Sequence, residues 1–325
     1  MREVAFIKQN KEKWLDFEAA IFGKAKKNPD EIAGLYIHLI NYLSYAQTYY
    51  PKSKTVVYLN YLASQIYQKI YKTKRTEQNR IIYFFSEEVP LIVYHYRRYL
   101  VYAFVLFFLC TGIGVLSARY DLDFVRLILG DDYVNMTLEN IKEGNPVAVY
   151  KSGSNWGGFI AITMNNLYVG AQCFIWGIFL GIGTFYIMLQ NCIMLGSFQY
   201  FFYQEGVFWE SVQGIWIHGS MEIFAIVIET AAGFILGASI LFPKTYSRMN
   251  SFKIGFKDSL KIFLSTIPFT IAAGFLEGFV TRYALEMPKW LNVVIILGTL
   301  SLISFYFLLF PFIVHRKKNL NITTS

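Results

Sequence analysis

The stretch IWIHGSMEIFAIVIE (residues 215–229) decides the fold prediction, because it is apolar enough to cross a bilayer and yet carries one histidine and two glutamates. At about 100° per residue, Glu222 lies about 40° from His218 around a helix, and Glu229 lies between them in angle. A charged side chain at the centre of a transmembrane helix costs on the order of 2.5 to 3.5 kcal/mol on an insertion scale. We therefore expect these three side chains to face an interior polar seam, in contact with protein or a wet cavity and not with lipid.

Other polar side chains interrupt the neighbouring apolar runs and are candidates for the same seam. They are Asn165, Asn166, Gln190, Asn191 and Glu277. Ionisable residues inside a membrane are functional candidates by default, because they are costly to bury. Structural pairing explains the same pattern, since polar contacts between helices commonly hold a bundle together. The sequence leaves both interpretations open.

His218 and Glu222 are separated by four residues, so their side chains lie on one helical face and can share a proton or a metal ion. A metal site needs three or four ligands, and the sequence places only two together. Metal binding is therefore left open, and no cofactor is expected.

The composition is that of a polytopic membrane protein with a basic N-terminal region. The 325 residues are 55% hydrophobic, 18% aromatic and only 16% charged. Residues 1–98 hold 16 Lys and Arg against 9 Asp and Glu, so a net charge of only +1 is left for residues 99–325. No Gly-rich phosphate loop, zinc-finger spacing or ribonucleoprotein motif accompanies this charge, which favours binding to anionic lipid headgroups over nucleic acid.

We predict an all-α, polytopic membrane protein with about six transmembrane helices. A basic region of amphipathic helices (1–98) precedes the transmembrane domain (99–315), and a short tail (316–325) follows it. The six spans are expected at about 99–118, 159–181, 184–202, 211–242, 262–280 and 291–314. Within the first region, Asn28 and Ser53 are suited to cap the second and third helices.

Charge asymmetry predicts the orientation. Basic residues crowd the N-terminal region, the 243–261 loop and the C-terminal tail, whereas the 119–157 and 204–210 segments are acidic. Loops rich in Lys and Arg remain on the cytoplasmic side. Both termini are therefore expected to be cytoplasmic, with residues 119–157 outside.

The 119–157 segment has apolar residues at roughly helical spacing among its acidic residues. Such helices can lie at the membrane interface. They are expected either to present a docking surface for an external partner or to cap the helical bundle.

Two pairs of glycines have the four-residue spacing of close helix packing: Gly177 with Gly181, and Gly233 with Gly237. We expect them to serve contacts inside the bundle.

Signatures of enzymes are missing. The chain has no H-E-x-x-H, no G-x-S-x-G and no P-loop. Ser220 is two residues from His218, on a different face of the helix, so the pair does not make a nucleophile and its base. We expect this chain not to be an enzyme.

A series of motifs resembles the stage II sporulation protein M family of bacterial and archaeal membrane proteins. The motifs are Trp14, Tyr58-Leu59-Asn60-Tyr61-Leu62 with Tyr67 and Tyr71, Asn165-Asn166, Gly181-Ile182-Gly183-Thr184, His218-Gly219-Ser220-Met221-Glu222, Ala232-Gly233, and Phe275-Leu276-Glu277-Gly278-Phe279-Val280-Thr281. The resemblance covers nearly the whole chain. Glu229 departs from the family pattern, which more often has a small residue there.

The resemblance implies a multi-pass protein of the bacterial cytoplasmic (inner) membrane that assembles with other membrane or envelope proteins. The family's namesake looks like the membrane anchor of a complex that remodels the cell wall. A scaffold or assembly subunit is thus the first functional hypothesis, and no catalytic residue is implied. The rival is a transporter or channel that moves protons or cations along the His/Glu seam. The partner, any transported species and the oligomeric state, including a homo-oligomer, stay open.

Overall fold

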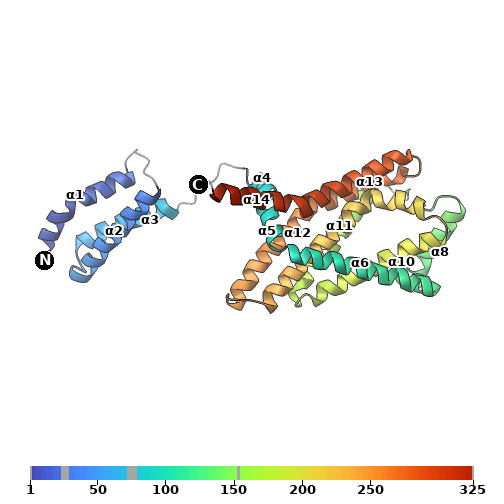
Figure 1. Cartoon of the computed structure of the whole chain (residues 1–325), viewed down its shortest axis with the longest axis horizontal. Helices are drawn as coiled ribbons and strands as arrows, with labels where there is room; N and C mark the ends of the chain where they lie inside the picture. Colours follow the sequence, from blue (N-terminus) through green and yellow to red (C-terminus); the bar gives the residue numbers. More distant parts are fainter. Residues whose placement is uncertain (1, 23–28, 72–78, 152–153, 324–325) are drawn as a thin grey trace. The chain divides into compact units, whose positions relative to one another are not determined.

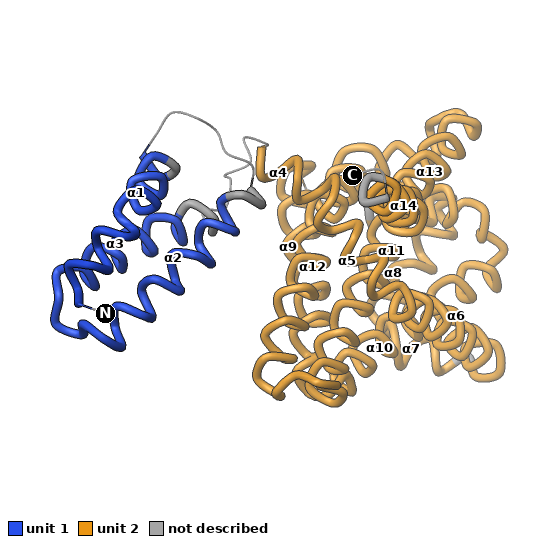
Figure 2. The backbone as a smooth tube through the Cα atoms, turned by 60° about the vertical axis from the view of Figure 1, so that its left-hand side comes forward, with its two compact units in different colours: residues 1–78 blue, residues 79–325 orange. Residues whose placement is uncertain are grey.

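The computed structural model describes residues 2–22, 29–71, 79–151 and 154–323, and every regular element in these ranges is helical. The prediction of an all-α protein is confirmed. The chain divides into two compact units, Met1–Gln78 and Asn79–Ser325, coloured separately in Figure 2.

The first unit contains α1 (Glu3–Phe22), α2 (Pro29–Tyr49) and α3 (Lys54–Tyr71). They share a core of their own in which Phe6, Trp14, Phe17, Leu39, Leu59, Leu62 and Ile66 are buried. The Val56 amide donates to the Ser53 hydroxyl (3.3 Å), so the predicted cap of the third helix is confirmed. The predicted cap at Asn28 and the Tyr71 side chain lie outside the described residues.

The second unit begins earlier than the first predicted span. Residues 79–98 form α4 (Arg80–Tyr83), η1 (Phe84–Glu88) and α5 (Val89–His95), and they pack on α12 and the C-terminal helices. Lys261 forms an ion pair with Glu88 at 2.6 Å, and the Tyr96 hydroxyl donates to Asp258 at 3.2 Å. The division between the units thus falls at residue 78, because these polar contacts attach the elbow of residues 79–98 to the transmembrane bundle.

The rest of the second unit is a bundle of long helices, with two short helices at residues 122–129 and 131–142 after the first long one (Figure 1). Its elements are α6 (Arg97–Tyr120), α7 (Leu122–Leu129), α8 (Asp131–Lys142), η2 (Ala148–Lys151), α9 (Asn155–Ile175), η3 (Trp176–Ile178), α10 (Ile182–Gln204), α11 (Phe208–Leu241), α12 (Arg248–Phe279), η4 (Thr281–Tyr283), α13 (Lys289–Ser304), η5 (Phe305–Leu309) and α14 (Phe310–Thr323).

Within the described ranges, five helical stretches are long and apolar enough to cross a membrane. They are Arg97–Tyr120, Asn155–Ile178, Phe208–Leu241, Arg248–Tyr283 and Lys289–Leu320. Helix α10 has 23 residues and packs against α6 and α11, but Gln190, Asn191 and Gln199 make it more polar than these five. The sixth span therefore stays a prediction. The predicted turn near Gly181 is present, with Leu180 and Gly181 at φ 58° and 85°.

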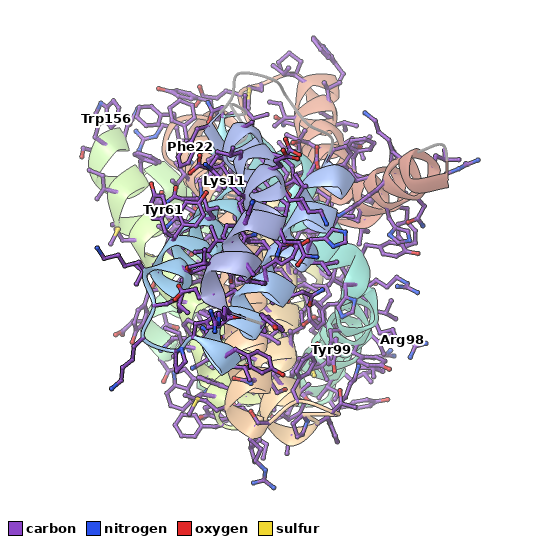
Figure 3. All side chains as sticks on the ribbon, turned by 90° about the vertical axis from the view of Figure 1, so that its left-hand side faces the viewer. Lys11, Phe22, Tyr61, Arg98, Tyr99 and Trp156 are labelled. Carbon is purple, nitrogen blue, oxygen red and sulfur yellow. The ribbon has the colours of Figure 1, made fainter. Side chains whose placement is uncertain are left out.

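Exposed tryptophans mark the first turns of three of these helices. Trp156 lies at the start of α9, Trp209 at the start of α11 and Trp290 at the start of α13, and all three side chains are exposed. Figure 3 shows Trp156 at the periphery of the molecule. Tryptophan concentrates where a membrane meets water. Alternating long helices that begin in this way fit a bundle that crosses the bilayer repeatedly.

Helix α11 lies at the centre of the bundle and contacts α6, α9, α10, α12 and α13. Its C-terminal half approaches the α9–α10 turn at the two predicted glycine pairs. A Cβ on Gly177 would collide with the Gly233 carbonyl oxygen, and one on Gly237 would collide with the Gly181 backbone. The glycines therefore serve contacts inside the bundle, as predicted.

Substitution Gly233→Ala should destabilise the bundle, because the added methyl group would collide with the Cys173 carbonyl and the Thr184 side chain. Overpacking of this kind costs roughly 1 to 3 kcal/mol, so the apparent melting temperature in detergent should fall by roughly 2 to 12 °C. Gly112→Ala in α6 is the control, since nothing lies within 4 Å of the new methyl group. Equal melting temperatures for the two variants would contradict this packing.

Candidate functional site

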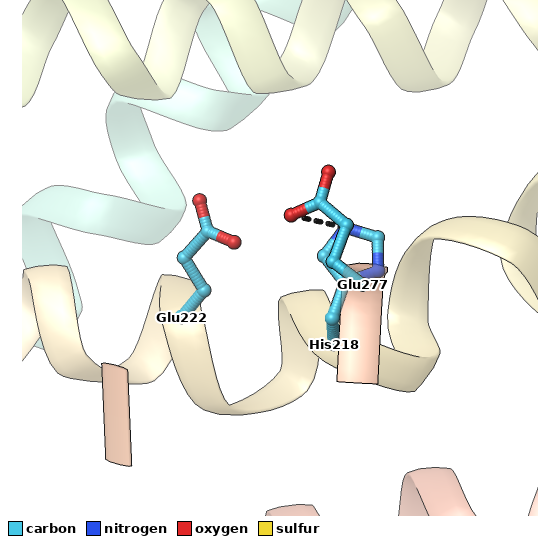
Figure 4. A group of neighbouring side chains, drawn as sticks. All are labelled: His218, Glu222 and Glu277. Atoms are coloured by element: carbon cyan, nitrogen blue, oxygen red, sulfur yellow. Dashed lines mark ion pairs between the residues drawn. The ribbon is translucent and has the colours of Figure 1, made fainter. Parts of the chain in front are cut away.

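The site is built on the N-terminal half of α11 and the C-terminal end of α12. One helical turn of α11 places His218 and Glu222 on the same face, and Glu277 approaches them from α12. The ligating atoms of these three side chains all lie within 4.8 Å of one another. Figure 4 shows the His218 ring beside the Glu277 carboxylate, with Nε2 and Oε2 separated by 3.7 Å. We call these three residues the triad.

The histidine is held from its other side. Its Nδ1 lies 2.9 Å from the Thr281 hydroxyl in η4, directly after α12. The His218 side chain is 5% exposed and that of Glu277 is 12% exposed. The imidazole is therefore fixed in orientation, while both carboxylates retain access to the space in front of it.

That space is a cavity of about 680 Å³. All three triad residues line it, together with Asn165 and Asn166 of α9 and Asn191 of α10. Asn166 is buried, and its side chain interacts with the Glu222 carboxylate. The cavity thus combines three titratable groups and three carboxamides with an otherwise apolar wall.

Helices α7 and α8 form one side of the wall of this cavity. Ile128 and Leu129 of α7 and Tyr133 of α8 belong to its wall. Burial raises the pKa of Tyr133 to about 12, so the phenol remains neutral at physiological pH. Of the two roles considered for residues 119–157, the structure shows capping of the bundle by these residues.

Two of the eight predicted seam residues lie elsewhere. Glu229 is 1% exposed and accepts a hydrogen bond from the Thr266 hydroxyl at 2.6 Å, in a space left by Gly170. Gln190 is on the exposed side of α10, where its amide donates to the Tyr186 hydroxyl at 2.9 Å. The other six, His218, Glu222, Glu277, Asn165, Asn166 and Asn191, meet at the cavity.

Sequence analysis did not find Thr266 or the cavity wall formed by α7 and α8. A threonine in an apolar run is too common to be singled out, and its pairing with Glu229 joins residues of different helices. The amphipathic pattern of α7 and α8 showed that they cover an apolar surface but not which one.

The fold and the site together define a multi-pass helical membrane protein with a polar cavity between its helices. The model of the family described as stage II sporulation protein M matches residues 103–282. The chain belongs to the stage II sporulation protein M family, as the resemblance in its motifs predicted, but the match does not extend over nearly the whole chain: the N-terminal motifs at Trp14 and at residues 58–71 lie outside it. A second family model, described as a domain of unknown function (DUF8413), matches residues 4–72 and thus the first unit. No curated protein and no solved structure matches the chain.

The arrangement can bind a cation or hold protons. Carboxylates and a neutral imidazole are ligands for both, and the carboxamides supply donors or acceptors around them. The stage II sporulation protein M family is not known as a family of enzymes.

Water should reach this cavity. We expect an Asn165→Cys variant, made after Cys110, Cys173 and Cys192 are replaced by alanine, to react with a charged thiol reagent that does not cross membranes. Asn165 lines the cavity, whereas Gln190 is exposed outside it. The thiolate that reacts forms readily only in contact with water. Gln190→Cys in the same background is the control, and equal labelling of the two variants in intact membranes would contradict a wet cavity.

Proposed function

We propose that this chain is a non-enzymatic scaffold or assembly subunit of a membrane or envelope complex. The observation that carries the proposal is the first unit, which has its own core and its own family model and is joined to the transmembrane unit in one chain. A separately folded helical unit adds a surface to the membrane protein that the bundle itself does not need for packing.

The surface of the first unit supports binding to other molecules. Phe22 and Tyr61 are stacked with ring centroids 6.4 Å apart, and their side chains are 59% and 52% exposed. Figure 3 labels this pair together with Lys11. Exposed aromatic pairs are typical of contact surfaces, because they bury a large area at little entropic cost.

The proposed location is the bacterial cytoplasmic membrane, with both termini cytoplasmic. The basic residues of the first unit would then face the anionic inner leaflet, which attracts Lys and Arg. The partners are other membrane or envelope proteins and membrane lipids, and nucleic acid is not among them.

A transporter for protons or cations is the second candidate, and the cavity is the observation that favours it. Beyond the cavity, however, the C-terminal half of α11 is tightly packed. Val227, Ile228, Ala231 and Ala232 are buried there, next to the glycine contacts. This tight packing supports a cavity that ends within the bundle more than a pathway through it.

The assembly proposal predicts stoichiometric partners. Purification of the tagged full-length chain in a gentle detergent, after treatment of membranes with a lysine-reactive cross-linker, should retain them. Mass spectrometry should locate cross-links at exposed lysines of the first unit such as Lys8, Lys11, Lys13, Lys52 and Lys54. Glu222→Gln should keep the same partners, because Glu222 lies in the cavity and not on the first unit.

The opposite pattern would support the transporter. It consists of a chain without partners, together with cation or proton flux into liposomes that Glu222→Gln abolishes.

The proposed orientation is tested separately. A reporter domain that is active only in the cytoplasm should be active when it is fused to either terminus. The reason is that basic segments flank the spans on the cytoplasmic side. A C-terminal reporter that works only outside would mean that α10 does not cross the membrane.

A further inference from the structure

We propose that the triad of His218, Glu222 and Glu277 binds a divalent transition-metal ion such as Zn²⁺ or Mn²⁺. This inference is independent of the assembly role. It adds a ligand to the cavity, and the sequence alone had left metal binding open because only two ligands were visible.

The spacing of the ligand atoms fits a slightly open metal site. Two ligands on one Zn²⁺, each at about 2.0 to 2.2 Å in tetrahedral geometry, lie roughly 3.3 to 3.6 Å apart. The separation of His218 Nε2 and Glu277 Oε2 is 3.7 Å, and all three ligand atoms lie within 4.8 Å of one another. The Glu222 side chain has to move towards the other two ligands when the ion binds, and it is less buried than His218.

The charges also favour a divalent cation. Two carboxylates next to an imidazole at this depth need positive charge, since an uncompensated ion in a medium of low dielectric constant is costly. Within the described ranges, the residues that line the cavity include no Lys or Arg. One divalent ion neutralises both carboxylates and leaves the imidazole neutral, the form in which histidine binds metals.

The surroundings of His218 match those of a metal ligand. Metal-binding histidines usually make a hydrogen bond with the ring nitrogen that does not face the metal. Here Nδ1 has the Thr281 hydroxyl at 2.9 Å, and Nε2 faces Glu277. With the proton on Nδ1, the Nε2 lone pair and the carboxylate oxygen point at the same space, and a cation between them removes the repulsion of the two acceptors.

Asn166 supports the position of one ligand. It is 7% exposed, lines the same cavity, and its side chain interacts with the Glu222 carboxylate. A hydrogen bond from an amide to a metal-binding carboxylate orients that ligand.

The chain offers a matched control for the test. Glu229 is a buried glutamate on the same helix, but it pairs with Thr266 and lies outside the cavity. Glu229→Gln therefore makes the same chemical change as Glu222→Gln without touching the triad. Thr281→Val removes only the partner of Nδ1.

The experiment uses the full-length chain in lipid nanodiscs, stripped with a chelator, equilibrated with Zn²⁺ or Mn²⁺ alone and desalted. Metal analysis should give about one ion per chain for the wild type and for Glu229→Gln. Glu222→Gln and Glu277→Gln should bind at least about a hundredfold more weakly, and Thr281→Val about tenfold to hundredfold more weakly. Melting temperatures in the presence of chelator establish that each variant is folded, because no metal contributes there.

The inference is overturned if the folded wild type retains no stoichiometric metal, or if Glu222→Gln and Glu277→Gln bind it as tightly as Glu229→Gln does. Either result would leave protons to neutralise the carboxylates. Neither depends on whether partners are captured, so the metal site and the assembly role fail separately.

Discussion

The close approach of α11 to the turn between α9 and α10 brings backbone against backbone and leaves no room for side chains at four positions. Gly177 faces the Gly233 backbone, and Gly181 faces Gly237, so four positions without side chains let the backbones touch. In a membrane, helices gain little from the hydrophobic effect, and van der Waals contact at small residues replaces it. The Thr184 hydroxyl adds a hydrogen bond of 2.7 Å to the Cys173 carbonyl at the same place. This contact fixes the C-terminal half of α11.

Because that half is fixed, the two halves of α11 differ in character. The C-terminal half is packed with small and branched apolar residues, whereas the N-terminal half carries His218 and Glu222 beside a cavity. Glu229 lies between the two. Its carboxyl group occupies the space beside Gly170 and accepts a hydrogen bond from Thr266. Glu229 therefore has a polar partner within the packed region. One apolar helix can therefore contain both a dry interface and a polar site.

Sequence patterns predicted the features that are determined within a single helix or turn. The burial of the 215–229 stripe, the glycine pairs and the turn at Gly181 all follow from periodicity or backbone freedom, and the structure has each of them. Which seam residues meet was not predictable in the same way. Glu277 joins His218, but Glu229, on the same stripe, does not, because the crossing of α11 and α12 decides which residues face each other. Gln190 and Asn191 are neighbours in sequence, yet only Asn191 lines the cavity.

Helix α12 contacts three separate features of the second unit. Its Lys261 pairs with Glu88 in residues 79–98, its Thr266 donates a hydrogen bond to Glu229, and its Glu277 completes the triad with His218 and Glu222 of α11. Helix α12 packs along α11 through apolar residues such as Ile262 and through Gly255, which faces Ser239, and at the Glu277 end His218 and Glu277 add a polar contact. A cation bound by the triad would join the two helices there, and it would stabilise the folded bundle in proportion to its affinity, because the unfolded chain does not present the three ligands together. A metal site at this position would therefore be compatible with a scaffold, because its contribution to stability would not require the ion to move through the bundle.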